Sequence, residues 1–277
     1  IANAIGINIS TLASGGLITN SGPGTIEVEV DASSSAEANA HGINVGTLGG
    51  SITNSGYIEA EVSAEGSSSA EANAYGIRTD TVSSSGAITN SGDIKVTVAS
   101  TMPENEQLEV QIPLERIAPS LDVYAAGIYV DTLEVGGTIS NTGNIDITNN
   151  QTGGIVSGIF VNNMNGTISD VGTITTADEG TYAIYLKDGT GTLKLTADDD
   201  VTGLIHVNAH NVTIDATGQS AVFNFEDENI EAGEFDTKTN EYSGSWKNIG
   251  NEDYPIYSWS AVSINSADMD TSSMAVP

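Results

Sequence analysis

The residues of this sequence best suited to chemistry are a run of three carboxylates and a pair of histidines. Asp198, Asp199 and Asp200 form the densest acidic run, and His206 and His210 lie four residues apart. Calcium binds carboxylate and carbonyl oxygens, so an acidic turn could hold this ion. Adjacent residues of a strand point to opposite faces, however, and residues four apart on a strand are separated by roughly 13 Å. We therefore expect surface or turn residues and no metal or cofactor, with calcium as the alternative.

A polysaccharide-degrading enzyme would need either a basic residue beside acidic groups or two carboxylates facing one cleft. The arginines are Arg78 and Arg116, and both lie in variable parts of the sequence. No Gly-x-Ser-x-Gly phrase marks a nucleophile, and no glycine-rich stretch continues into the lysine and helix of a phosphate loop. We therefore expect no catalytic residue and no enzyme. A calcium-dependent polysaccharide-degrading enzyme remains the alternative.

A repeated phrase sets the framework that positions these residues. Its copies span 4–30, 40–62, 74–98, 126–147 and 157–174, and each contains a Gly-Ile anchor. Every copy has three short runs of alternating apolar residues, separated by Gly, Asn and Ser, which predicts three strands and three turns. A propeller would need longer repeats of four antiparallel strands. The pattern favours an all-β fold, a right-handed parallel β-helix with three sides.

Stacked coils should place equivalent residues in columns about 4.8 Å apart. The predicted structural ladder is a column of amide side chains at one corner, formed by Asn20, Asn54, Asn90 and Asn141. The fifth copy has Asp170 instead, which cannot donate when ionised, so the ladder should weaken or end there. The corner glycines two residues after each asparagine are expected to have positive φ; they are Gly22, Gly56, Gly92 and Gly143.

The copies differ mainly after their third strand. Variable segments follow at 31–39 and 63–73, and an insertion spans 99–124. Loops from one corner should align along one edge of the rod, where binding is usually placed. We expect the β-helix to cover 1–225 and a capping or linker region, rich in Trp and Tyr, to cover 226–277. The anchor is already in register at the first copy, which favours a truncated rod over one whose end stacks on another molecule.

The strong negative charge of the chain limits the kinds of partner that it can bind. The 277 residues include 37 Asp and Glu against 7 Lys and Arg, a formal net charge of −30. Such a surface repels phosphate and anionic membranes, so we expect no nucleic-acid partner. The sequence has no cysteine, which excludes disulfides, and no apolar run long enough to span a bilayer, so we expect no membrane insertion by this segment.

The phrase Gly-x-Ile-Thr-Asn-Ser-Gly-x-Ile, as in Gly50–Ile58 and Gly86–Ile94, resembles the passenger region of Gram-negative autotransporters. The end, Val262–Pro277, is similar to the phrase that often joins such a passenger to its membrane barrel, with Asp268 and Thr271 in matching places. The resemblance implies export across the outer membrane to the cell surface. It also implies a role in adhesion, aggregation or surface-layer structure. The partner would be a host or neighbouring cell-surface protein or glycan, or the protein itself. A self-polymerising filament subunit is the other alternative.

Overall fold

The computed structural model describes residues 1–32, 37–65, 71–101, 122–149, 155–176, 181–196, 198–207, 211–215, 221–226, 234–236, 241–244 and 257–261. In this part of the chain every regular element is a strand, and the strands form three sheets. No helix among these residues is long and apolar enough to cross a membrane. Arg116, His210, Trp246, Tyr254 and the terminal phrase 262–277 lie outside the described residues.

From β1 to β20, each sheet contains every third strand of the chain. Sheet A contains β1 (Ala2–Leu12), β4 (Glu37–Leu48), β7 (Glu71–Val82), β10 (Asp122–Leu133), β13 (Ile155–Met164), β16 (Tyr182–Gly189), β19 (Leu204–Val207), β21 (Ala221–Glu226) and β24 (Tyr257–Ala261). Sheet B contains β2 (Leu17–Asn20), β5 (Ser51–Asn54), β8 (Ala87–Asn90), β11 (Thr138–Asn141), β14 (Thr167–Asp170), β17 (Thr192–Thr196), β20 (Asn211–Asp215), β23 (Glu241–Gly244) and β22 (Glu234–Asp236). Sheet C contains β3 (Thr25–Ala32), β6 (Tyr57–Glu65), β9 (Asp93–Thr101), β12 (Asn144–Asn149), β15 (Thr173–Thr176) and β18 (Asp200–Thr202).

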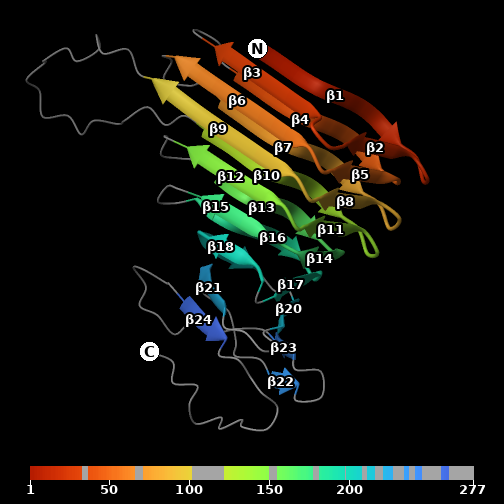
Figure 1. Ribbon diagram of the computed structural model, residues 1–277, viewed down its shortest axis with the longest axis vertical. Helices are drawn as coiled ribbons and strands as arrows, with labels where there is room; N and C mark the ends of the chain where they lie inside the picture. Colours follow the sequence, from red (N-terminus) through yellow and green to blue (C-terminus); the bar gives the residue numbers. More distant parts are fainter. Residues whose placement is uncertain are drawn as a thin grey trace, which may run out of the picture.

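These sheets are the three sides of one parallel β-helix. Successive strands of a sheet are one coil apart and pair in parallel, for example Ile7 with Ile43 and Ile43 with Ile77. The strands wind as a right-handed coil down the long axis of the molecule (Figure 1). Parallel crossovers have this hand in nearly all proteins. The fold class predicted from the repeated phrase is confirmed.

The core is the interior of the coil. Columns of isoleucine run down it as the repeats predict, and Ile43, Ile52 and Ile58 of the second coil are completely buried. The matching side chains of the first coil, Ile7 and Ile26, are only partly buried. Alternation places one residue in two inside, so the short strands fill the interior with small and medium aliphatic side chains. Stability therefore grows coil by coil, without a single central core.

The glycine of each Gly-Ile anchor makes room for two successive inward-facing residues. Gly42 and Ile43 are both buried within β4, which interrupts the alternation. A Cβ on Gly42 would lie 2.5 Å from Cγ2 of Ile58 in sheet C and 2.7 Å from the carbonyl oxygen of Gly76 in the next coil. Both distances are too short for a side chain, so only glycine fits beside sheet C at this bend.

The corner positions after the asparagines require glycine for a reason that differs from the predicted one. The φ of Gly22 is 61°, as expected, but Gly56, Gly92 and Gly143 do not have positive φ. The prediction of positive φ is wrong for these three. A Cβ on each would instead collide with a backbone carbonyl of the preceding coil, such as that of Gly24 for Gly56. Glycine is required at these three positions because the corners stack closely, and not because of the backbone torsion angle.

Connections of variable length all leave one corner of the triangle. They join a sheet C strand to the next sheet A strand, and the residues outside the strands are 33–36, 66–70, 102–121, 150–154 and 177–181. The strands extend further than the sequence suggested, since β9 continues to Thr101 and β10 begins at Asp122. Toward the C-terminal end the pairing turns antiparallel, with β24 on β21 and β23 on β20. These antiparallel strands end sheets A and B.

Candidate functional site

The predicted asparagine ladder is a continuous internal chain of hydrogen bonds. Nδ2 of Asn20 donates to Oδ1 of Asn54 at 2.8 Å, Asn54 donates to Asn90 at 2.6 Å, and Asn90 donates to Asn141 at 2.6 Å. Three of the four side chains are completely buried, and 8% of Asn20 is exposed. The second proton of Asn54 binds the Gly56 carbonyl at 3.3 Å. The ladder thus satisfies buried polar groups at a corner, and its role is structural.

The ladder ends after Asn141, but the replacement of asparagine by aspartate is not the direct reason. A register shift between β11 and β14 pairs Asp170 with Ser140, whose hydroxyl donates to the carboxylate at 2.8 Å. The next position in the column is taken by Val171, which is buried and accepts the Asn141 amide proton through its carbonyl at 2.5 Å. A backbone oxygen therefore terminates the column, and Asp170 lies beside it.

The acidic run at the predicted turn also has a structural role. One oxygen of Asp199 accepts the backbone N–H of Gly172 at 2.8 Å, and the other accepts that of Thr196 at 2.6 Å. The carboxylate thus binds backbone donors of two successive coils at the corner that follows the ladder. Within the described residues no group of three His, Cys, Asp or Glu side chains is placed to hold a metal ion.

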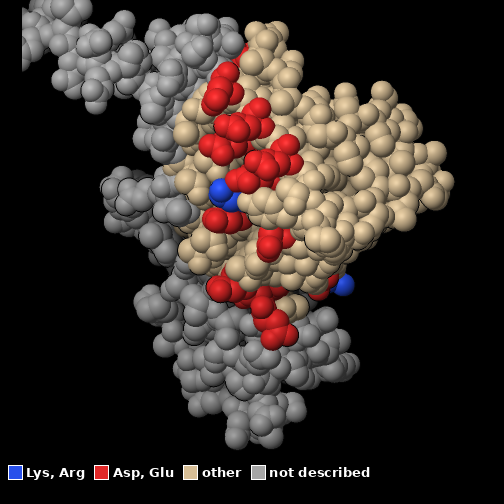
Figure 2. All heavy atoms as spheres, turned by 45° about the horizontal axis from the view of Figure 1, so that its top comes forward, with Lys and Arg blue, Asp and Glu red and all other residues tan. Residues whose placement is uncertain are grey.

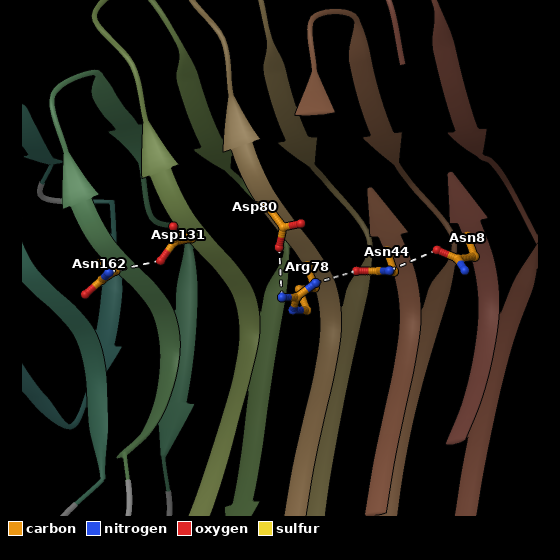
Figure 3. A network of polar contacts seen from close by, with 6 residues as sticks. All are labelled: Asn8, Asn44, Arg78, Asp80, Asp131 and Asn162. Carbon is orange, nitrogen blue, oxygen red and sulfur yellow. Dashed lines mark hydrogen bonds and ion pairs between the residues drawn. The ribbon is translucent and has the colours of Figure 1, made fainter. Parts of the chain in front are cut away.

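The outer face of sheet A carries a polar network in its first three coils (Figure 3). Asn44 donates to Asn8 at 2.9 Å and accepts from Nη1 of Arg78 at 2.9 Å. Nη2 of Arg78 also pairs with Asp80 at 2.8 Å. Asn162 donates to Asp131 at 3.0 Å two coils further along. This face presents amides, a guanidinium and carboxylates that already hold one another in place.

The same column becomes aromatic from the fourth coil onward. Tyr129, Phe160, Tyr185 and His206 are paired coil by coil. The ring centroids of Tyr129 and Phe160 are 5.0 Å apart with planes 3° from parallel, and those of Tyr185 and His206 are 4.4 Å apart at 12°. The Arg78 guanidinium lies 5.7 Å from the Tyr129 centroid and joins the two halves. We call the full set, from Asn8 and Asn44 through Arg78 to His206, the outer column.

Sequence reasoning missed this outer column, although a signal was available. Each member is the residue directly after the isoleucine of the Gly-Ile anchor or its counterpart, as Tyr129 follows Ile128 and Phe160 follows Ile159. The histidine expected to be an ordinary surface residue, His206, is half-buried and stacks on Tyr185. It belongs to a stack of rings that parallel in-register strands impose.

Beside the outer column lies a second group of rings. Tyr75 is only 7% exposed on this outer face, because it packs with Ala126 and Phe160, where the small Ala126 leaves space. Burial raises the pKa of its hydroxyl. His41 packs on Tyr75 with centroids 5.2 Å apart, and neither ring nitrogen has a hydrogen-bond partner. Burial, assisted by the charge of Arg78, lowers the pKa of His41 to about 4. His41 is therefore neutral at neutral pH.

The outer face of sheet C is acidic. Glu27 is in register with Glu59, and Glu29 with Glu61, so like charges stand one coil apart. Figure 2 shows the resulting red stripe along the rod, interrupted by a single blue side chain. Nζ of Lys95 pairs with Glu59 at 2.6 Å, and this hydrogen bond lowers the pKa of Glu59 and raises that of Lys95. Repulsion along the stripe opposes folding and keeps other acidic surfaces away.

Three stacked parallel sheets with an internal amide ladder define the chain as a three-sided parallel β-helix. No family model, curated protein or solved structure matches it.

Proposed function

We propose that this chain is a secreted or surface-exposed rod that binds a protein or glycan of a neighbouring or host cell. The observation that carries the proposal is the outer face of sheet A. There, amides, Arg78 and aromatic rings follow one another in register over successive coils. Such a column offers hydrogen bonds and apolar contact together, and aromatic residues with Arg dominate the energetics of many interfaces.

The arrangement of connections supports the same proposal. In the sequence the variable segments fall between the end of a sheet C strand and the start of the next sheet A strand, and these strand ends meet at one corner beside the face that carries the outer column. The acidic sheet C adjoins that corner from the other side and would repel acidic surfaces. A partner would therefore approach sheet A. The resemblance of the repeated phrase to autotransporter passengers adds the proposal that the rod reaches the outside of a Gram-negative cell and acts in adhesion, aggregation or surface-layer structure.

The test is binding of beads coated with the purified 277-residue chain to cultured host cells, bacterial cells and glycan arrays. We expect capture by at least one surface and a reduction of tenfold or more in the variants Arg78→Ala and Tyr129→Ala. Val135→Ala is the matched control, because Val135 is 74% exposed in a turn away from the outer column. Beads that neither bind nor cluster would refute adhesion, and equal loss in all three variants would refute the choice of face.

A further inference from the structure

The outer face of sheet A carries a hydrophobic cluster that is separate from the core inside the coil. Three of its members are buried, and three more pack against them and are partly exposed. The six residues, which we call the outer cluster, are Tyr75, Ala126, Phe160, Tyr129, Ile155 and Tyr185. They come from β7, β10, β13 and β16, so the cluster spans four successive coils. Contiguous apolar side chains on the outside of a protein mark an interaction surface.

Side chains of opposite charge lie beside the outer cluster, in one column of the same face. Asp131 lies two residues after Tyr129 in β10. Lys187 lies two residues after Tyr185 in β16 and is exposed. Asn162 of β13 stands between the two charges in the column and donates to Asp131 at 3.0 Å (Figure 3). An apolar centre with charged groups at its rim is the usual composition of a protein–protein interface.

The stacking of the rings favours a protein over a glycan as the partner. The Phe160 ring lies between those of Tyr129 and Tyr185, with planes 3° and 1° from parallel and centroids 5.0 and 5.4 Å away. Both faces of the Phe160 ring are therefore covered, so a sugar ring cannot stack on it. The ring edges that remain can pack between the side chains of a facing sheet, because two sheets that pack face to face interdigitate.

The positions of the two charges make this face complementary to a second copy of itself. Asp131 lies one coil before Phe160, and Lys187 lies one coil after it. If two sheet A faces meet across a twofold axis that runs along β13, each coil before Phe160 faces the coil at the same distance after it. Asp131 of one copy then faces Lys187 of the other, and the symmetry forms this pair twice. Because the two residues stand at different coil levels, a symmetric pair of rods brings them together only when the rods are antiparallel.

Side-chain size selects the level of the axis. With the axis along β13, Tyr182 faces the small Ala126 of the other copy. Moving the axis by half a coil would pair Lys187 with Asp80 instead, but it would also place Tyr182 against Tyr75 and crowd two large side chains. Charge and volume together therefore favour a single register.

The acidic outer face of sheet C excludes a second copy on that side. The chain has a formal net charge of −30, and the in-register glutamates of sheet C would repel those of another rod (Figure 2). Sheet A carries two of the four basic side chains in the described ranges, Arg78 and Lys187. A face that presents both signs of charge is the one on which a second acidic rod can dock.

We propose that two copies of this chain bind each other through their outer clusters, with the rods antiparallel and Asp131 of each copy paired with Lys187 of the other. The inference rests on the proposed function, because it names a second copy as the partner of the same face. Rods that project toward each other from two neighbouring cells are antiparallel, so this contact would join cell to cell.

Sedimentation equilibrium of the 277-residue chain measures the contact. We expect the mass to rise with concentration from 28.4 kDa to twice that value and no further. Asp131→Lys and Lys187→Asp should each raise the dimer dissociation constant about tenfold or more, because each places two pairs of like charges in the contact. An equimolar mixture of the two variants should dimerise again, since one copy then has lysine, and the other aspartate, at both positions.

Asp146→Lys and Lys194→Asp are the matched controls. Each makes the same charge change as one of the two variants, in the same coil, but on sheet C or sheet B. Both side chains are exposed, and neither substitution should change the dissociation constant. Circular dichroism shows whether each variant folds.

A single cysteine gives an independent measurement, because the chain has none of its own. Asn162 stands on the proposed axis, so a short bismaleimide should cross-link Asn162→Cys to its copy. Asn44 lies three coils before Asn162, so Asn44→Cys would stand six coil spacings, about 29 Å, from its copy and should not be cross-linked.

A monomer at every concentration would overturn the proposal. So would a dimer that both charge reversals leave intact, or a mixture that stays monomeric while both controls dimerise. Failure of the proposed function is seen separately. Coated beads that capture host cells or glycans, while the free chain stays monomeric, would remove only the dimer. A dimer in solution combined with beads that neither bind nor cluster would remove only the adhesive role.

Discussion

Replacing Asn54 by leucine should destabilise the protein by about 3 kcal/mol. The substitution removes the donor to the buried Oδ1 of Asn90, and an unsatisfied buried acceptor costs roughly 1–3 kcal/mol. It also removes the hydrogen bonds with Asn20 and with the Gly56 carbonyl, each worth about 0.5–1.5 kcal/mol. Asn20 keeps its contact with the Tyr57 carbonyl at 3.2 Å, and the leucine side chain gains apolar burial, so the net loss falls in the lower half of the summed range of about 2–6 kcal/mol.

Urea unfolding followed by circular dichroism measures this loss, with Asn44→Leu as the matched control. Asn44 also belongs to an amide ladder, but on the outer face, where water replaces lost partners, so its substitution should change stability by no more than about 0.5 kcal/mol. If the two variants unfold at the same urea concentration, burial is not the reason that the inner ladder contributes to the free energy of unfolding. The variant Asn54→Asp sharpens the test. Protonation restores a donor, so its folded-state pKa is raised and its stability should fall as pH rises through that value.

Three further predictions concern single side chains. Thr79→Val should stabilise by about 1 kcal/mol, because the buried hydroxyl of Thr79 faces the aliphatic core without a hydrogen-bond partner; a lower midpoint in urea would refute this. Gly42→Ala should lower stability by 2 kcal/mol or more through the clash with Ile58, seen as a lower melting temperature, and an unchanged melting temperature would contradict the packing argument. His41 should make stability fall by up to about 3 kcal/mol as pH is lowered from 6.5 to 4, because the unfolded chain binds its proton first; the variant His41→Phe should lose that part of the pH dependence.

The sequence predicts the coils and the inner columns well because both follow from repetition. Identical residues at equivalent places, such as Asn54 and Asn90, can only be stacked if the strands are parallel and in register. What could not be predicted depends on contacts between backbones or on a local shift. Gly92 is required because its backbone lies close to the preceding coil, and a sequence pattern that looks for positive φ cannot show this contact. The bulge beside Asp170 shifts the register of β14 by one residue, and the register is regained in β15. The outer column was missed because its members, such as Tyr129 and His206, are different residue types, so the repeats show no identity at this position.

The strings Ser33–Ala40 and Ser67–Ala74 are identical, and in the structure they lead into successive strands of sheet A, where Asn39 and Asn73 stand 34 residues apart in one column. A genetic exchange between the two matching stretches would delete or duplicate one complete turn of the rod, in frame. The inner columns of isoleucine and asparagine would continue across the junction, because the two turns carry the same residues at those positions. Each such exchange would change the length of the rod by one step of about 4.8 Å.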